Sequence, residues 1–269
     1  MERTIYPNAK INIGLNIVRR REDGYHDIET IFCPVRILDS IVIDLSKNPD
    51  EGSFSMSSAE SMEFKGDNTV EIAYNMLRER FGIPALSVIL RKHIPTGAGL
   101  GGGSADAAFF IKAVNDYFLL GMTFKEMEEM AAKIGSDCAF FIENSPKYAT
   151  GRGEVLTPVP MIDCRYVIKV IKPKFNISTK EAYSMVKPQE PTSSLIDDYK
   201  RPVSEWRGLI KNDFEQFLFP KYPDLQRYKD ALYDSGAIYA AMTGSGSALF
   251  GIFDHEPVLN DEIRGLAVL

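Results

Sequence analysis

A glycine-rich segment at residues 95–105 constrains this chain more than any other stretch. Five of the seven residues from 97 to 103 are glycine, and glycine lets a backbone approach a ligand closely. Residues 86–90 before it predict a strand, and the residues after it predict a helix, with Ser104 as the cap and Asp106 where a helix start favours negative charge. The free N–H groups of a helix start bind anions. The segment therefore predicts an anion-binding loop, with a flexible turn as the alternative.

Three known anion loops can be compared with this segment. A P-loop ends in Gly-Lys-Ser/Thr, and the segment contains no lysine. Gly97, Gly99 and Gly102 match the dinucleotide-binding pattern G-x-G-x-x-G, but a second predicted helix follows where that fold needs a strand ending in an acidic residue. A protein-kinase loop would need a V-A-I-K strand and an H-R-D motif, which the sequence lacks. None of the three types fits.

The composition is that of an ordinary globular protein of 269 residues, with 45% hydrophobic and 25% charged residues and a net charge of −6. This acidic balance argues against a nucleic-acid partner, and no apolar run reaches the length of a membrane span. The first residues show no signal-peptide pattern. Cys33, Cys138 and Cys164 are odd in number and form no metal motif. We therefore expect a cytoplasmic protein without a nucleic-acid or membrane partner.

A strand with one polar face is expected near the start of the chain. Residues 9–17 alternate between apolar side chains on one face and Lys10, Asn12, Gly14 and Asn16 on the other. Lys10 and Asn12 are two residues apart, so their side chains point the same way, roughly 6.5 Å apart along the strand. A solvated surface is the usual meaning of such a face. The single charge and two amides favour a working surface instead.

Two further segments have both a structural and a functional interpretation. Asp137 precedes an apolar stretch at residues 138–142 that predicts a strand. It is either a capping residue or a catalytic carboxylate, since partial burial raises the pKa of an aspartate unless a cation lies beside it. Residues 242–253 form a second glycine-serine loop that leads into a strand. This loop is either a hairpin turn or a second clamp on the polyphosphate that the first loop binds.

The remaining pattern predicts alternating helices, strands and loops. A capping box at Thr123 and Glu126 opens a helix whose apolar side, Phe124, Met127, Met130 and Ile134, is expected in the core. Other segments are less distinctive. They are a helix over 70–81 capped by residues 67–69, weak strands and loops over 46–65, a surface loop over 187–202, and helices over 209–218 and 225–234.

The order of the motifs is similar to that of a known family. Residues 95–105 read Pro-x-x-x-Gly-Leu-Gly-Gly-Gly-Ser-Ala, which resembles the ATP loop of the GHMP kinases, a superfamily of small-molecule kinases. Five other motifs stand around it in one order. They are Ala-Lys-Ile-Asn at 9–12, Asp-Gly-Tyr-His at 23–26, Gly-Ser-Asp at 135–137, Gly-Arg-Gly-Glu at 151–154 and Thr-Gly-Ser-Gly at 243–246. Together they resemble the 4-diphosphocytidyl-2-C-methyl-D-erythritol kinases, the GHMP family of the non-mevalonate isoprenoid pathway.

The resemblance implies an α+β protein with the two-lobed GHMP kinase fold. The N-terminal lobe, residues 1–157, is expected to resemble domain 2 of ribosomal protein S5 and to bind ATP. The C-terminal lobe, residues 158–269, is expected to be ferredoxin-like. Cys138 and Ala139 depart from the family, which more usually has a bulky aliphatic residue and proline there, and Ala105 replaces a frequent second serine. These departures remove no reacting group.

The resemblance also implies the role of each site residue. Asp137 would be the general base and Lys10 its electrostatic partner. The ATP-binding residues would be Pro95, Thr96, Gly97, Ala98, Gly99, Leu100, Gly101, Gly102, Gly103, Ser104, Ala105, Asn68 and Lys92. The residues binding the cytidine diphosphate-linked substrate would be Asn12, Tyr25, His26, Thr179, Tyr183, Gly244 and Ser245. ATP and Mg²⁺ are the expected cofactors, with the metal ligands left open.

The reaction implied is ATP-dependent phosphorylation of the 2-hydroxyl of 4-diphosphocytidyl-2-C-methyl-D-erythritol. Two alternatives remain open. The chain is otherwise a GHMP kinase for a mevalonate-like or sugar substrate, or a non-catalytic relative that only binds nucleotide. The second alternative would be expected to lack Lys10 or Asp137, and both are present. A monomer or weak homodimer is expected.

Overall fold

The chain packs as two compact units, each made of segments from different parts of the sequence. The computed structural model describes residues 2–44, 55–58 and 68–268. Unit 1 and unit 2 are described separately. Unit 1 consists of Met1–Ala9, Arg36–Thr96 and Gly101–Asn144, and unit 2 of Lys10–Val35, Gly97–Leu100 and Ser145–Leu269. The predicted boundary between residues 157 and 158 concerns the lobes of the family and stays a prediction.

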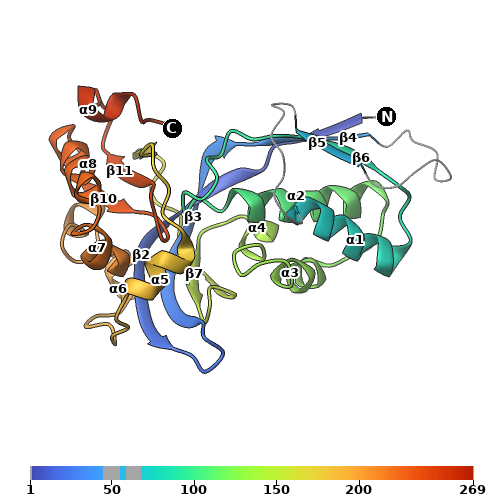
Figure 1. Ribbon diagram of the computed structural model, residues 1–269, viewed down its shortest axis with the longest axis horizontal. Coiled ribbons are helices and arrows are strands. Elements are labelled where there is room, and N and C mark those ends of the chain that lie inside the picture. The colour runs from blue at the N-terminus through green and yellow to red at the C-terminus, as the bar shows by residue number, and fades with distance from the viewer. Residues whose placement is uncertain (1, 45–54, 59–67, 269) are drawn as a thin grey trace. The chain divides into compact units, whose positions relative to one another are not determined.

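Unit 1 contains a four-stranded sheet in the order β1-β4-β6-β5 (Figure 1). Its strands are β1 (Glu2–Ile5), β4 (Ser40–Asp44), β5 (Ser55–Ser58) and β6 (Ser87–Arg91). β4 pairs antiparallel with β1 and β6, and β5 runs parallel to β6. Ile41 and Ile43 on β4 lie opposite Leu90 and Val88 on β6, and all four are buried. One face of the sheet therefore belongs to the core of unit 1.

Four helices complete the described part of unit 1. They are α1 (Thr69–Phe81), α2 (Gly102–Tyr117), α3 (Phe124–Ala132) and α4 (Phe140–Glu143). α2 packs against α1, α3 and α4, and in Figure 1 these helices lie along one side of the sheet. Ala105, Ala107 and Ala108 on α2 are completely buried. Their small side chains let the first turns of α2 approach its neighbours closely, which fixes the exit of the glycine-rich loop.

Unit 2 contains two sheets. The first has the order β2-β3-β7-β8 and the second the order β10-β11-β9. Their strands are β2 (Asn8–Arg20), β3 (His26–Leu38), β7 (Lys147–Thr150), β8 (Val155–Pro158), β9 (Val167–Ile171), β10 (Tyr239–Met242) and β11 (Leu249–Phe253). The first residues of β2 and the last of β3 belong to unit 1. β2 carries the motif at residues 9–12, and β10 leads directly into the second glycine-serine loop.

The helices of unit 2 cover a core formed largely by the second sheet. They are α5 (Thr179–Met185), α6 (Leu195–Tyr199), α7 (Asp213–Leu218), α8 (Pro223–Asp234) and α9 (Asp261–Arg264), with a short 3₁₀ turn at Val203–Glu205. α8 packs on β10 and β11. Phe214 of α7, Met242, Leu249 and Phe253 lie together in this core. The start of α7 is thereby packed beside the loop that follows β10.

Several local predictions are confirmed. The Asn68 side chain accepts a hydrogen bond from Val70 N, and α1 ends at Gly82, whose φ of 65° is in the left-handed region. Thr123 and Glu126 form the predicted capping box. The mixed α/β architecture agrees with the predicted fold class. β5 lies within the predicted weak strands of residues 46–65. The other residues of that stretch that precede 55 or follow 58, and Asp67, lie outside the described residues.

Other local predictions were wrong. Residues 138–142 form turns and α4 instead of a strand, because a short apolar run is equally compatible with a buried helix. α2 begins at Gly102 behind Gly101, whose φ is 71°, so Ser104 lies in the first turn and does not cap it. Phe124 is 58% exposed although its helix buries Met127 and Met130. The predicted surface loop over 187–202 contains α6.

Candidate functional site

The polar face of β2 is buried, so the interpretation of a solvated surface was wrong. Lys10 and Asn12 are 3% and 2% exposed. The Lys10 ammonium donates a hydrogen bond of 2.6 Å to Asn12 Oδ1 and lies 4.9 Å from the centre of the Phe32 ring. A buried amide oxygen and an aromatic face both attract a cation. These contacts fix the position of the Lys10 charge at the end of β2.

Asn12 is held by hydrogen bonds from both sides. Its backbone N–H donates to Thr243 Oγ1 at 2.9 Å, and its side-chain amide donates to Thr30 Oγ1 at 3.0 Å. Thr30 in turn donates to the carbonyl of Gly14 at 2.6 Å. Thr243 Oγ1 also lies 3.3 Å from both Asn12 Oδ1 and the carbonyl of Gly99. The orientation of Lys10 therefore depends on two threonines on other segments of unit 2.

Two glycine loops contact each other within unit 2. A Cβ atom on Gly99 would lie 2.3 Å from the carbonyl oxygen of Thr243, and one on Gly244 would lie 3.1 Å from the Cα of Gly99. Both glycines also have positive φ, 78° and 55°. A side chain at either position is therefore disfavoured by close contacts and by the backbone conformation. Ala248 N donates to the carbonyl of Ala98 at 3.3 Å. The second glycine-serine loop is thus more than a hairpin turn, although a polyphosphate between the loops stays a prediction.

Five predicted substrate-binding side chains make three pairwise contacts, one of them with Arg152. The His26 and Tyr183 rings stack with centroids 4.9 Å apart. Burial lowers the pKa of His26, and the charge of Arg20 lowers it further. Tyr25 is 56% exposed, and the guanidinium of Arg152 lies 4.9 Å from its ring centre. In the third pair, the hydroxyls of Thr179 and Ser245 lie 3.2 Å apart.

In unit 1, the turn that carries Asp137 packs against the first turn of α2. Burial raises the pKa of the Cys138 thiol to about 11, while a hydrogen bond with Ser104 lowers it and the charge of Asp137 raises it. A Cβ on Gly135 would lie 3.3 Å from Cys138 Sγ and 4.0 Å from Ser104 Oγ. The structure therefore brings Ser104 of the ATP loop and the Asp137 turn together.

Lys92 is buried in an ion cluster, formed with Asp39 and Asp106, that flanks the ATP loop. Its side chain is 7% exposed, and its ammonium pairs with Asp39 and, at 2.7 Å, with Asp106 on α2. Asp39 Oδ1 also accepts hydrogen bonds from His93 N and Ile94 N, at 2.6 and 2.8 Å. The cluster ties the chain entering the loop to the helix leaving it. Contact between Lys92 and ATP stays a prediction.

The cluster holds two carboxylates and one cation in a buried place. Burial raises the pKa of Asp106 to about 7, since the charge of Lys92 lowers it only in part and Asp39 raises it further. Burial also lowers the pKa of Lys92, but the two carboxylates outweigh it and the pKa is raised. Asp106 Oδ1 is buried without a hydrogen-bond partner among the described residues. A proton on Asp106 would make the cluster neutral.

Comparisons with known proteins identify the family of the chain. Residues 68–144 match the family model of the GHMP kinases N terminal domain, and residues 201–266 match that of the GHMP kinases C terminal. The chain is 48% identical to a 4-diphosphocytidyl-2-C-methyl-D-erythritol kinase from Parabacteroides distasonis, covering 93% of this chain and 91% of the relative. It is 46% identical to one from Bacteroides fragilis, covering 93% and 92%. The chain belongs to this kinase family.

Solved structures place the kinase in the same fold. A crystal structure of 4-(cytidine 5'-diphospho)-2C-methyl-D-erythritol kinase superposes with a TM-score of 0.75 at 29% identity, covering 94% of this chain and 90% of the other. The mevalonate kinase of Methanococcus jannaschii superposes with a TM-score of 0.67 at 13% identity, covering 98% and 93%. The second likeness shows the fold alone. The predicted GHMP kinase fold and an ATP-dependent small-molecule kinase activity are confirmed.

The two predicted catalytic residues fall in different units of the kinase. Lys10 belongs to unit 2 and Asp137 to unit 1, so their pairing stays a prediction. The ATP loop is divided in the same way, with residues 97–100 in unit 2 and the rest in unit 1.

Substitution of Asp106 should change how the stability of the kinase depends on pH. With the folded-state pKa raised from 3.8 to about 7, stabilisation from the bound proton is complete below about pH 4 and lost as the pH rises through about 7. Asp106→Asn keeps a neutral side chain at every pH. We compare the free energies of unfolding of Asp106→Asn and the wild type. Between pH 5.5 and pH 8.5, the difference between them should shift by about 1–2 kcal/mol in favour of Asp106→Asn. Urea unfolding at both pH values measures this.

Asp116→Asn is the matched control, because it removes a carboxylate from the same helix at an exposed position. Asp116 is 63% exposed and lies 3.6 Å from Arg3. An exposed pair of this kind contributes at most about 1 kcal/mol. If the free energy of unfolding depended on pH equally in Asp106→Asn and the wild type, Asp106 would not be the group that binds the proton in the folded state.

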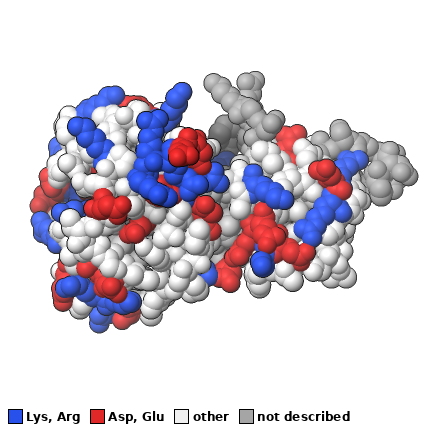
Figure 2. Space-filling model, turned by 90° about the horizontal axis from the view of Figure 1, so that it is seen from below, with Lys and Arg blue, Asp and Glu red and all other residues white. Residues whose placement is uncertain are grey.

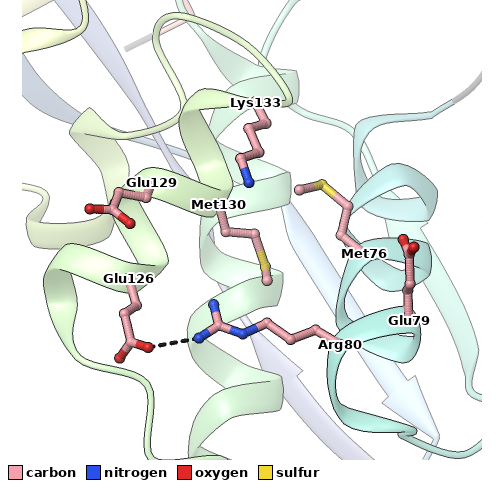
Figure 3. A pocket seen from close by; sticks show the side chains of 7 residues that line it. All are labelled: Met76, Glu79, Arg80, Glu126, Glu129, Met130 and Lys133. Carbon is pink, nitrogen blue, oxygen red and sulfur yellow. Dashed lines mark hydrogen bonds and ion pairs between the residues drawn. The ribbon is translucent and has the colours of Figure 1, made fainter.

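A groove between α1 and α3 contains none of the predicted site residues. It has a volume of about 350 Å³ and is lined by Met76, Glu79, Arg80, Glu126, Glu129, Met130 and Lys133 (Figure 3). Arg80 crosses it to bond Glu126 at 2.7 Å, with both side chains more than a third exposed. Figure 2 shows acidic and basic side chains interspersed over one face of the molecule.

Several residues that organise the candidate site were not predicted from the sequence. Thr30 and Asp39 were missed because each stands beside another polar residue, Glu29 or Ser40, in a stretch without a distinctive motif. Thr243 was seen only as part of a glycine-serine motif. Asn212 was not singled out either, although it is buried.

Two further features were searched for in the part of the chain that the structure describes. None of its helices has the length and apolar character of a membrane span. It contains no group of three or more His, Cys, Asp or Glu side chains that could hold a metal ion.

Proposed function

We propose that this kinase transfers the γ-phosphoryl group of ATP to the 2-hydroxyl of 4-diphosphocytidyl-2-C-methyl-D-erythritol, in the non-mevalonate route to isoprenoids. One observation carries the proposal beyond the kinase class. Relatives with this activity in their names share 44–48% identity with nearly the whole chain. Within unit 2, Lys10, Asn12 and the two glycine loops lie together, which supports a reaction centre at this end of β2.

The ATP loop has the features that a triphosphate needs. α2 begins behind Gly101, and no side chain caps its first turn. The amides of that turn and the helix dipole favour an anion. A Cβ on Gly102 would lie 2.9 Å from the Ile94 side chain, so the chain must stay glycine there and its backbone can approach a phosphate. Pro95, Thr96, Ser104 and Ala105 would complete the phosphate side, and Asn68 the nucleoside side.

The chemistry requires little beyond positioning and charge, because phosphoryl transfer has a loose, highly charged transition state. Asp137 would accept the proton of the substrate hydroxyl as its oxygen attacks the γ-phosphorus and ADP leaves. Lys10 would keep Asp137 ionised and stabilise the charge on the transferred phosphoryl group. Asn12 fixes the Lys10 ammonium and would also contact the substrate.

The cytidine side would use the residues near β3 and α5. Tyr183 is held by its stack on His26 and by an edge contact with Phe214. Tyr25 is exposed enough to place a ring on the base. The lowered pKa of His26 keeps its imidazole neutral at pH 7, with one donor and one acceptor for the base edge. Thr179, Gly244 and Ser245 would contact the rest of the substrate.

Mg²⁺ fits this arrangement as a metal bound mainly by phosphate. The described residues contain no protein cage for a metal, and Mg²⁺ in kinases is bound by few protein groups plus substrate phosphates. The ion would neutralise charge on the phosphates. Ser104 of the glycine-rich loop would be a candidate ligand. We also propose action in the cytoplasm, because the three described cysteines are free thiols.

Substrate profiling with purified enzyme tests the proposal. With ATP and Mg²⁺, kcat/KM for 4-diphosphocytidyl-2-C-methyl-D-erythritol should exceed that for mevalonate, homoserine or galactose by about 10⁴-fold or more, since the site is built to hydrogen-bond cytosine. Phosphorylation of mevalonate but not of the cytidylyl alcohol would support another GHMP kinase. Nucleotide binding without turnover on any acceptor would support a non-catalytic relative.

A further inference from the structure

Four residues at the start of α7 contact three parts of the proposed site. The proposed mechanism gives none of these four residues a role in the reaction. Residues 212–215 read Asn-Asp-Phe-Glu. The segment begins with Asn212, which is 2% exposed, and includes Phe214, which is completely buried. A helix start on the surface would need only a cap. These four side chains instead point at β2, at Tyr183 and at the second glycine-serine loop.

Asn212 holds the second glycine-serine loop directly. Its side-chain amide donates to the carbonyl of Met242 at 2.8 Å and to the carbonyl of Gly244 at 2.9 Å. Its Oδ1 accepts from Phe214 N at 3.0 Å, which caps α7. The Asn212 side chain therefore uses its Nδ2 on the two carbonyls that flank Thr243 and its Oδ1 on the cap. Thr243 is the residue that bonds Asn12.

Glu215 bonds the residue at the start of the same loop. Its Oε1 accepts the backbone N–H of Met242 at 2.7 Å, and its Oε2 pairs with Lys229 of α8 at 2.5 Å. Both backbone groups of Met242 are thus bonded to side chains of α7. Such double anchoring fixes the direction in which the chain leaves β10 and enters the loop.

Asp213 and Phe214 connect the segment to β2 and to the aromatic stack. Asp213 Oδ2 accepts from Ile17 N at 2.7 Å, and Leu15 N donates to the carbonyl of Lys211 at 2.8 Å. Phe214 contacts the Tyr183 ring edge to face, with centroids 4.9 Å apart. β2 carries Lys10 and Asn12, and Tyr183 belongs to the proposed cytidine side.

We infer that residues 212–215 are a positioning segment for catalysis, in which Asn212 sets the second glycine-serine loop so that Thr243 orients Asn12 and Lys10. The inference rests on the proposed function for its link to turnover. Its structural part consists of the hydrogen bonds from Asn212 and Glu215 to residues 242–244. These bonds do not depend on the substrate. A shift of about 1 Å in a positioned group lowers turnover by about 10²-fold.

Asn212→Asp tests the inference because it separates the two roles of this side chain. Aspartate caps a helix as well as asparagine does, but it cannot donate to the two carbonyls and places a negative charge against them. Asn260→Asp is the matched control. Asn260 caps α9 by accepting from Glu262 N at 2.9 Å, and it lies outside the proposed site.

Two readouts are needed on both variants, kcat at a temperature well below the melting transition and backbone amide hydrogen exchange over residues 242–248. In Asn212→Asp we expect kcat to fall by about 10–100-fold, KM for ATP to change by less than about threefold, and exchange over 242–248 to accelerate. Asn260→Asp should match the wild type in both readouts. Asn212→Ser, which also retains a cap, replaces Asn212→Asp if the latter does not fold.

Each outcome decides the inference. Unchanged exchange in the Asn212 variant overturns the hold on the loop, even if kcat falls. Faster exchange with unchanged kcat overturns the link to catalysis. If the wild-type enzyme itself does not phosphorylate the cytidylyl alcohol, the proposed function fails, and the exchange experiment still supports or overturns the structural part.

Discussion

Asp137→Asn is expected to abolish turnover while ATP still binds. Asparagine has nearly the same shape as aspartate but cannot accept the proton of the substrate hydroxyl. Loss of a general base typically costs about 10²–10⁴-fold in kcat, and the charge on the γ-phosphoryl group raises this cost, because an unassisted hydroxyl is a poor nucleophile. Single-turnover kinetics with the purified variant measure the chemical step. Calorimetric titration should give a Kd for ATP within about threefold of the wild type, because Asp137 is expected to act on the acceptor.

Glu143→Gln is the control for this substitution. Glu143 is exposed and ends α4, the short helix that follows the Asp137 turn. The variant removes one negative charge from the same segment without touching the turn. It should retain turnover within about twofold, since exposed charges act weakly across water. Near-normal turnover in Asp137→Asn would remove this residue from the role of base.

The structure around the ATP loop was largely predictable from the sequence, because its signals are local. The strand, the run of glycines and the following helix lie within about 30 consecutive residues. The caps at Asn68 and Thr123 were also predicted, since capping depends on residues two or three positions apart. The prediction failed where local signals are ambiguous. The apolar residues before Asn144 suit either a strand or a helix, and packing against α2 selects α4.

The ion cluster and the α7 segment were not predictable, because their partners are far apart in the sequence. Lys92 is 53 positions from Asp39, and Asp213 of the α7 segment is 196 positions from Ile17. No periodic pattern encodes such contacts. A buried charge or amide is recognisable only when the fold shows what surrounds it. The resemblance predicts roles for Lys10 and Asp137, but the sequence did not indicate the residues that hold Lys10 in place.

Lys10→Met is expected to lower kcat by about 10²–10³-fold with a smaller effect on the KM for the cytidylyl substrate. The Lys10 charge is fixed by Asn12 Oδ1 at 2.6 Å and by the Phe32 ring, so it needs no reorganisation when charge develops on the phosphoryl group. Removing a preorganised charge of this kind typically costs about 10²–10³-fold in kcat. Methionine fills the same volume without the charge, which limits the loss of packing. Steady-state kinetics with saturating ATP provide the measurement.

Lys169→Met is the matched control, because it removes another lysine of unit 2 by the same substitution. Lys169 lies on β9, its side chain is 21% exposed, and its ammonium pairs with Glu256 at 2.5 Å. Its neighbour on β11 is Gly251, which lies beyond the Thr-Gly-Ser-Gly motif at 243–246. Its kcat should stay within about twofold of the wild type. Lys10→Met must also melt within a few degrees of the wild type, since a loss of folded enzyme would lower turnover without any chemical cause. An unaffected kcat in folded Lys10→Met would mean that the buried cation only stabilises β2, and the electrostatic half of the proposed mechanism would fail.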